Sequence, residues 1–295
     1  MNRLVARALS AILPSNVVET LIAAREALAV VGRAPEPWDE AAVQLDQLRP
    51  QALRIGYPQY LYGLLAAART ARAAGIDQFT AIEFGVAGGN GLVAMEQHAA
   101  SVEQLWSVSI HVVGFDTSSG LPRGTHPFDC PFAFRGGEFT MDAEKLRARL
   151  HRAELRLGDI TETGRTFAAA SFPPVGFVSN DLDLYTSTRD SFVLFDLPPE
   201  RFLPRVTMYF DDLMGYPYTT ITGEWAAIEE SNSIRKNRQL GHIYGLEHHI
   251  GRTYRFAAWP RAFFVMHVFD HPAYNAPELA RMPDLTLRGR HPSEP

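Results

Sequence analysis

The chain has 295 residues, of which 46% are hydrophobic and 21% are charged, and its formal net charge is −5. This balance is typical of a globular protein with a full core, and an acidic chain favours neither nucleic acid nor an anionic membrane as a partner. The single cysteine, Cys130, excludes a disulfide framework and a cysteine-based zinc site. No stretch approaches the ~18 uninterrupted apolar residues of a membrane span, so we expect a soluble, cytoplasmic protein.

The first 76 residues predict helices and no strand. Arg7 interrupts the apolar stretch at the N-terminus, which favours an amphipathic helix over a targeting segment. Apolar residues spaced three and four apart predict a second helix over 17–31 and a third over 60–75, which ends at a glycine. We expect 1–76 to form a helical cap or homo-oligomerisation layer outside the sheet, and 77–295 to form the sheet-containing domain.

From residue 77 onward, strand and helix patterns alternate. Strands are expected at 80–85, 111–116, 154–159, 175–185 and 205–212, and helices at 91–100, 141–153, 187–196 and 222–238. Two apolar runs around Pro260 predict an antiparallel pair that closes the sheet. The alternation predicts an α/β fold with a doubly wound, mostly parallel, Rossmann-like sheet, which binds ligands at the carboxyl ends of its strands.

The most informative segment is TAIEFGVAGGNG, residues 80–91, in which a short strand reaches an acid and a glycine-rich turn follows. The next predicted strand, HVVGFD, also ends in an acid, Asp116. A strand, a glycine turn, a helix and a second strand with a terminal carboxylate are how a parallel sheet binds the ribose of an adenosine cofactor.

Two cofactors compete for this turn. Gly89 to Ala94 matches the dinucleotide pattern G-x-G-x-x-A, which favours NAD. In that alignment the strand would run on to about Ala87 and bury Glu83 without a partner, which is energetically costly. If the strand instead ends at Glu83, this acid can meet the amino group of S-adenosylmethionine, and Gly85 lets the backbone pass close to the ligand. We therefore favour S-adenosylmethionine.

Further acids extend the expected cofactor site along the sheet edge. Asp116 is expected to accept hydrogen bonds from ribose hydroxyls, and Asp159, after the third strand, from the adenine amine. The predicted cofactor-binding residues are Glu83, Gly85, Gly89, Asp116, Asp159 and Asp181.

Carboxylates gather at the ends of the fourth and fifth predicted strands. NDLDLY, residues 180–185, closes the fourth, and FDD, residues 210–212, closes the fifth. Neighbouring parallel strands end about 4.8 Å apart, so these carboxylates should converge and repel one another unless a cation neutralises them. Oxygen ligands without cysteine or histidine favour Mg²⁺. Alternatively, some of these acids cap the following helices or pair with Arg189.

Five motifs together resemble the macrocin O-methyltransferase-like family in order and approximate spacing: IEFGVAGGNG, GFDTSSGLP, LGDITET, DLDLYTSTRD and YFDDLMGY. The resemblance covers residues 79 to about 230. Members of that family are class I S-adenosylmethionine-dependent enzymes that methylate sugar hydroxyls with Mg²⁺. The resemblance implies metal ligands at Asp183, Asp211 and Asp212, and a cofactor site at the 83–89 turn and Asp116. The sequence departs from the family pattern at Asn180, Leu182 and Thr186.

A metal at these aspartates could chelate two neighbouring hydroxyls of an acceptor and lower the pKa of one of them. Asp183 and His126 are the candidate catalytic residues, with His126 as the first candidate for the general base because its loop should cover the strand ends. His248 and His249 are the next candidates. Nearby, Phe128, Phe132 and Phe134 are expected to pack under the same loop rather than to form a substrate wall.

The sequence therefore predicts an S-adenosylmethionine-dependent, Mg²⁺-assisted O-methyltransferase acting on a small hydroxylated acceptor such as a sugar, a glycoside or another vicinal diol. Two other functions stay open. One is an NAD-dependent oxidoreductase, for which no hydride-transfer constellation is evident. The other is a non-catalytic relative that binds S-adenosylmethionine, which the departures at 180, 182 and 186 would allow.

Overall fold

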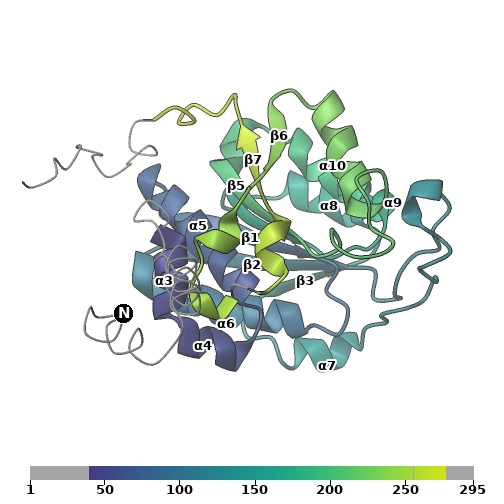
Figure 1. Cartoon of the computed structure of the whole chain (residues 1–295), viewed down its shortest axis with the longest axis horizontal. Coiled ribbons are helices and arrows are strands. Elements are labelled where there is room, and N and C mark those ends of the chain that lie inside the picture. Colours follow the sequence, from purple (N-terminus) through teal and green to yellow (C-terminus); the bar gives the residue numbers. More distant parts are fainter. Residues whose placement is uncertain (1–39, 255, 277–295) are drawn as a thin grey trace, which may run out of the picture.

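The computed structural model describes residues 40–254 and 256–276, and the two helices expected before residue 40 lie outside this part of the chain (Figure 1). Seven strands form one sheet in the order β3-β2-β1-β4-β5-β7-β6. They are β1 (Gln78–Phe84), β2 (Ser109–Asp116), β3 (Glu154–Leu157), β4 (Val175–Asn180), β5 (Phe202–Phe210), β6 (Arg238–His242) and β7 (Phe263–Val268).

Helices cover both faces of this sheet. The described helices are α3 (Glu40–Gln47), α4 (Arg49–Ile55), α5 (Pro58–Ala73), α6 (Asn90–Trp106), α7 (Ala143–Arg147), α8 (Ile160–Ala169), α9 (Tyr185–Ser191) and α10 (Gly223–Ile234). Figure 1 shows α3 to α6 on one side of the sheet and α8 to α10 on the other. The expected doubly wound α/β fold is confirmed. No helix in the described part of the chain is long and apolar enough to cross a membrane.

Strand direction places the ligand edge of the sheet. The pairs β1–β2, β2–β3, β1–β4 and β4–β5 are parallel, and only β7 runs antiparallel to its neighbours. The chain builds outward from β1 to β3 on one side and from β4 to β5 on the other. The carboxyl ends of β1 and β4 therefore flank the point where the strand order reverses, which is where open α/β sheets bind ligands.

The expected closing pair around Pro260 is half correct. The run after this proline forms β7, but the described residues of the run before it form no strand, and Pro260 itself lies in a short 3-10 helix, Trp259–Ala262. The antiparallel partners of β7 are β5 and β6. The sequence prediction placed residues 222–238 in one helix, whereas α10 ends at Ile234 and β6 begins at Arg238.

Helix α5 is a layer of the α/β core rather than a cap outside it. Its Leu61, Leu64 and Leu65 are fully buried and belong to the same apolar cluster as the sheet. A Cβ added at Gly63 would lie 2.2 Å from the ring of Phe177 on β4, so the helix backbone sits directly on the strand. The described part of the segment before β1 is thus continuous with the sheet's core, and oligomerisation through the N-terminal helices stays a prediction.

Candidate functional site

The turn after β1 requires glycine at two positions. Gly85 has a φ of +84° and Gly89 a φ of +81°, in the left-handed region that side chains disfavour. A Cβ at Gly85 would lie 1.8 Å from the backbone oxygen of Asp181, and one at Gly89 would lie 2.1 Å from Leu146 Cδ1. The turn therefore brings the backbone of β1 against the end of β4. Because β1 ends at Phe84, the strand does not continue to Ala87 as the dinucleotide alignment requires.

Asp116 closes β2 beside this turn, as expected. Its Oδ2 accepts hydrogen bonds from the backbone N–H groups of Val86 (2.9 Å) and Ala87 (2.8 Å), and its Oδ1 accepts one from Ser118 (2.6 Å). The glycine turn and the carboxylate thus hold each other in place. Charge-assisted bonds of this kind are stronger than neutral ones.

Glu83 does not stand open at the strand tip, and that expectation is wrong. It is 2% exposed, and the hydroxyl of Tyr60 donates a hydrogen bond of 2.7 Å to its Oε1. Burial raises the pKa of Glu83 to about 8, because an apolar environment disfavours the charged form. The hydrogen bond from Tyr60, on α5, allows this acid to be buried. Sequence reasoning missed Tyr60 because it placed α5 outside the sheet.

A cavity of ≈ 480 Å³ opens at the carboxyl ends of β1, β2, β4 and β5. This volume is within the range of small-molecule sites. The predicted site residues that line it are Gly85, Asp116, Asp159, Asp181, Asp183, Asp211 and Asp212. Glu83, Gly89 and His126 do not line it. One edge of the sheet therefore collects most of the residues that the strand-end rule selected.

Three carboxylates in the cavity wall form a compact group: Asp181, Asp211 and Asp212 each offer an oxygen within 4.8 Å of the others. No lysine or arginine among the described residues forms an ion pair with any of them. Although Asp181 is reached by water through the cavity, burial and the neighbouring carboxylates raise its pKa well above its ordinary value. Burial also raises the pKa of Asp212 to about 6. Such a donor set suits a hard divalent cation.

Asp183 lies beside this group rather than in it, whereas the family resemblance implied Asp183, and not Asp181, as a ligand together with Asp211 and Asp212. Its backbone N–H donates to Asp212 Oδ2 (2.9 Å), and its φ is +57°. Its Oδ1 lies 3.5 Å from the hydroxyl of Tyr218, which donates to Asp212 Oδ1 (2.7 Å). Burial, and then the charge of Asp212, raises the pKa of Asp183 to about 7. The two acids are thus linked through one tyrosine.

Side chains that the sequence analysis did not select fix the acidic group. The hydroxyl of Tyr209 donates to Asp211 Oδ1 (2.5 Å), and the fully buried Glu224 accepts from the backbone N–H of Asp212 (3.1 Å). Tyr209 had a signal in the sequence, since side chains two apart on a strand share a face. Glu224 and Tyr218 had none, because their contacts depend on the path of the loop after β5.

His126 has a structural role at the start of a short 3-10 helix, Pro127–Asp129. Its Nδ1 accepts from the backbone N–H of Phe128 (3.2 Å), and its ring packs on Tyr185, with 4.8 Å between the ring centroids. His248 and His249 do not line the cavity either. Within the described residues, the structure therefore brings none of the three candidate histidines to the cavity.

The buried Asp129 holds this loop against α9. It accepts hydrogen bonds from the backbone N–H groups of Thr125 (3.2 Å), His126 (3.1 Å) and Thr186 (2.8 Å). The nearby Phe132 is 70% exposed, so the expectation that it packs under the loop is wrong. Its ring lies opposite that of Tyr216, with 6.1 Å between centroids.

Comparison of the chain with protein-family models gives no match, and comparison with curated proteins gives none. Solved structures do resemble it. The O-methyltransferase NovP superposes with a TM-score of 0.49 at 15% identity, over 70% of this chain and 78% of that one. The calicheamicin methyltransferase CalS11 superposes with a TM-score of 0.42 at 19% identity, over 72% and 91%. The Podospora anserina methyltransferase PaMTH1, bound to S-adenosylhomocysteine, superposes with a TM-score of 0.37 at 11% identity, over 87% and 98%.

Proposed function

We propose that this chain is an S-adenosylmethionine-dependent O-methyltransferase that uses Mg²⁺ to methylate one hydroxyl of a sugar, a glycoside or another vicinal diol. One observation carries the proposal. Three carboxylates at the ends of β4 and β5, none of which forms an ion pair with a described residue, lie in the wall of the same cavity as Asp116 and the first glycine of the turn after β1. A cofactor site and a cation site thus share one space.

The residues around the cavity fit an adenosine cofactor. Gly85 leaves no side chain between the turn and the end of β4, and Asp116 can accept from ribose hydroxyls. Asp159 begins α8 and accepts from Thr161 through Oδ1, which leaves Oδ2 for the adenine amine. S-adenosylmethionine supplies a methyl group on a sulfonium, and its transfer is an in-line displacement that depends mainly on the position of the acceptor oxygen.

The residues also fit a magnesium ion. Asp181, Asp211 and Asp212 would hold it, and Tyr209 and Glu224 fix two of these three acids from behind. When bound, Mg²⁺ supplies positive charge that lowers the pKa of a coordinated hydroxyl. The chain's own contribution is to keep several acids uncompensated beside the cofactor space.

Asp183 is the best candidate to receive the proton of the acceptor hydroxyl. It lines the cavity, it stands outside the three-carboxylate group, and Tyr218 links it to Asp212. His126 is a weaker candidate because its Nδ1 and its ring are both engaged in the loop and it does not line the cavity.

A titration of the full-length chain tests the cofactor assignment. S-adenosylhomocysteine and NAD are each titrated calorimetrically, with and without Mg²⁺. We expect S-adenosylhomocysteine to bind and NAD to give no signal, because β1 ends three residues before Ala87 and the acids at the cavity suit a cation. Binding of NAD without binding of S-adenosylhomocysteine would identify a dinucleotide enzyme instead.

A second assay tests catalysis and the metal. Methyl transfer from labelled S-adenosylmethionine is measured against a panel of methyl glycosides, sugar phosphates and catechols, which all present adjacent hydroxyls. Asp211→Ala should abolish the transfer that the unmodified chain supports. Full turnover in this variant would end the metal assignment, and a chain that binds S-adenosylhomocysteine but methylates no diol would point to a non-catalytic relative.

A further inference from the structure

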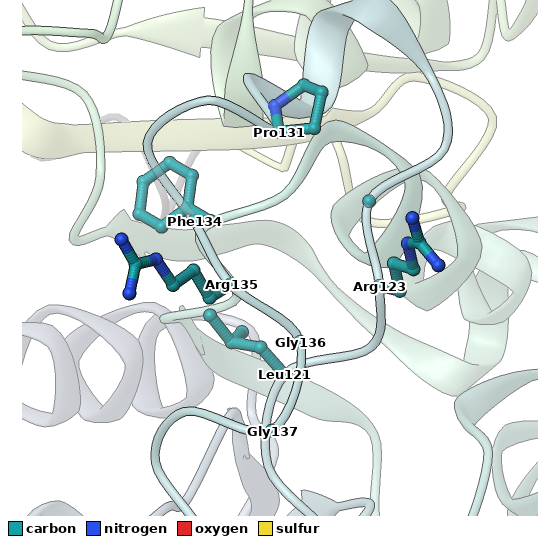
Figure 2. Close-up of a pocket in the computed structure, with 8 residues that line it drawn as sticks. Leu121, Arg123, Pro131, Phe134, Arg135, Gly136 and Gly137 are labelled. Carbon is teal, nitrogen blue, oxygen red and sulfur yellow. The ribbon is translucent and has the colours of Figure 1, made fainter.

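A second cavity, of ≈ 640 Å³, lies in the long loop between β2 and α7 (Figure 2). Two arms of that loop, residues 121–124 and 131–137, line it. Leu121 lines this cavity and the first one, so the two spaces adjoin. The loop therefore separates the acidic site from a second compartment that no step of the proposed reaction uses.

The two compartments carry opposite charge. The second cavity is lined by Arg123 and Arg135 and by no acid, whereas seven aspartates line the first. Neither guanidinium has an ion pair or a hydrogen bond with another described residue. Figure 2 shows one arginine on each arm, on opposite sides of the opening and extending outward. Such long, unpaired side chains can turn toward an anion at low cost.

The arms that carry the arginines are held together. Leu121 N–H donates to Glu138 O, and Gly137 N–H donates to Leu121 O, each at 2.8 Å. A Cβ at Gly136 would lie 3.3 Å from Arg123 Cα, so the backbones of the two arms are in contact. Among the described residues, the backbone N–H groups of Gly124 and Gly136 have no hydrogen-bond partner. These groups add donors to the two cations, a combination that suits an anion with several oxygens.

Two aromatic side chains connect this cavity to the acidic group. The ring of Phe134, in the cavity wall, lies 5.9 Å from that of Tyr218, whose hydroxyl lies 2.7 Å from Asp212 Oδ1. Because Leu121 lines both cavities, a ligand with its anionic group between the arms can extend another part of itself toward the acids. A ligand with both features has a hydroxyl at one end and a phosphate at the other.

We propose that the cavity between the arms binds a phosphate or diphosphate group carried by the acceptor, through Arg123 and Arg135. The acceptor is then a phosphorylated sugar rather than a neutral one. Identification of the ligand as the acceptor rests on the proposed function, whereas the anion site itself does not.

Calorimetric titration of the full-length chain, without divalent cations, tests the proposal. The probes are inorganic pyrophosphate, glucose 1-phosphate and glucose. Both phosphate compounds should bind, and glucose should not. Loss of one charge-assisted contact weakens binding roughly ten-fold, so the double variant R123A/R135A should lose more than either single variant. Arg147→Ala, an exposed arginine on α7, is the matched control and should bind as the unmodified chain does.

The outcomes separate this proposal from the proposed function. Absence of pyrophosphate binding, or equal affinity in R123A/R135A and the unmodified chain, would overturn the anion site. Binding of pyrophosphate without glucose 1-phosphate, or equal binding of glucose and glucose 1-phosphate, would overturn its assignment to the acceptor. S-adenosylhomocysteine binding by each variant reports on folding and on the cofactor site. If the unmodified chain does not bind S-adenosylhomocysteine, the proposed function is overturned but the anion site is not.

Discussion

Acids at this sheet edge meet two different environments. Glu83 is enclosed in the core, with one hydroxyl as its partner and no partner for Oε2 among the described residues. Asp181 and Asp211 face the cavity, where water or a cation can reach them. Burial therefore favours a neutral Glu83, whereas the cavity acids can bind a cation. Acids at the same edge of the sheet thus have two different roles, one inside the core and one in the cavity wall.

The substitution Glu83→Gln should change how the free energy of unfolding depends on pH. The pKa of Glu83 is about 8 in the folded chain, against an ordinary value of 4.5. Between these values the folded chain holds a proton that the unfolded chain has released, so the free energy of unfolding falls as pH rises through this interval. The contribution is at most about 1.4 kcal/mol per pH unit.

Urea unfolding of Glu83→Gln at about pH 5 and about pH 8 measures this contribution. The unmodified chain should lose more stability over that interval than the variant does. Glu229→Gln, at an exposed position on α10, is the matched control and should keep the original slope. Identical slopes for the unmodified chain and Glu83→Gln would mean that Glu83 is ionised in the fold.

Two neighbouring aspartates should respond differently to removal of their charge. Asp181→Asn removes a carboxylate from the three-membered group and should weaken Mn²⁺ binding about ten-fold or more. Asp183→Asn should bind Mn²⁺ nearly as tightly, while methyl transfer falls if Asp183 accepts the proton. Paramagnetic resonance of free Mn²⁺ measures the binding. The reverse pattern would restore Asp183 as the third ligand.

At the scale of elements, the turn between β1 and α6 depends on the backbone of Gly85. Alanine there has to adopt a φ of +84° and to place its Cβ 1.8 Å from Asp181 O, so the ends of β1 and β4 must separate. We expect Gly85→Ala to abolish S-adenosylhomocysteine binding and to destabilise the fold by about 3 kcal/mol.

Gly88→Ala is the matched control in the same turn. Its φ is not positive, and nothing lies within 4 Å of the added Cβ. Calorimetry and thermal unfolding should show near-normal binding and stability for this variant. Equal damage in the two variants would mean that the turn tolerates no side chain anywhere, rather than that Gly85 makes a specific close approach.

Patterns within single elements predicted most of the sheet. All five parallel strands were expected, because four are apolar runs that end at a polar turn and the third, ELRL, alternates apolar and charged residues. The fourth was expected to reach Tyr185, but β4 ends at Asn180. Helix α8 was missed because ITETGRTFAA contains threonines and a glycine, which have low helix propensity. Asp159 at its N-terminus and the buried Phe167 stabilise it. Strand β6 was missed because its pairing with β7 is a non-local contact.

The residues of the site were likewise predictable only where a pattern within one element selects them. Asp116 and the aspartates after β4 and β5 were found because parallel strands bring their carboxyl ends to one edge. That Asp181 rather than Asp183 joins Asp211 and Asp212 depends on the path of the chain after β4, where Asp183 has a left-handed backbone that no motif encodes. His126 was selected for its loop, and the loop does lie near the strand ends. The capping geometry that engages the ring is visible only in three dimensions.

At the scale of the whole molecule, charge is concentrated rather than spread. The chain carries a net charge of −5, and seven aspartates line one cavity at the end of the sheet. Neighbouring like charges destabilise the compact state unless a cation reduces their repulsion. The fold therefore keeps these acids for a ligand at a cost to its own stability.

The thermal stability of the chain should consequently depend on divalent cations, and substitution of one of the three acids should largely remove that dependence. Mg²⁺ binds only the folded chain, so its addition should raise the melting temperature, with a gain in free energy of about 2.7 kcal/mol at one hundred times the dissociation constant. Asp211→Asn removes one of three repelling charges. It should therefore melt higher than the unmodified chain in EDTA, yet gain little from added Mg²⁺.

Asp196→Asn is the matched control. Asp196 is an exposed acid at the end of the 3-10 helix Phe192–Asp196, where it pairs with Arg235, and its substitution should leave the Mg²⁺ gain unchanged. Differential scanning calorimetry of the three chains with EDTA and with Mg²⁺ measures both effects. A lower melting temperature for Asp211→Asn in EDTA would show that its bond to Tyr209 stabilises the fold more than the repulsion opposes it, and an undiminished Mg²⁺ gain would remove Asp211 from the ion's ligands.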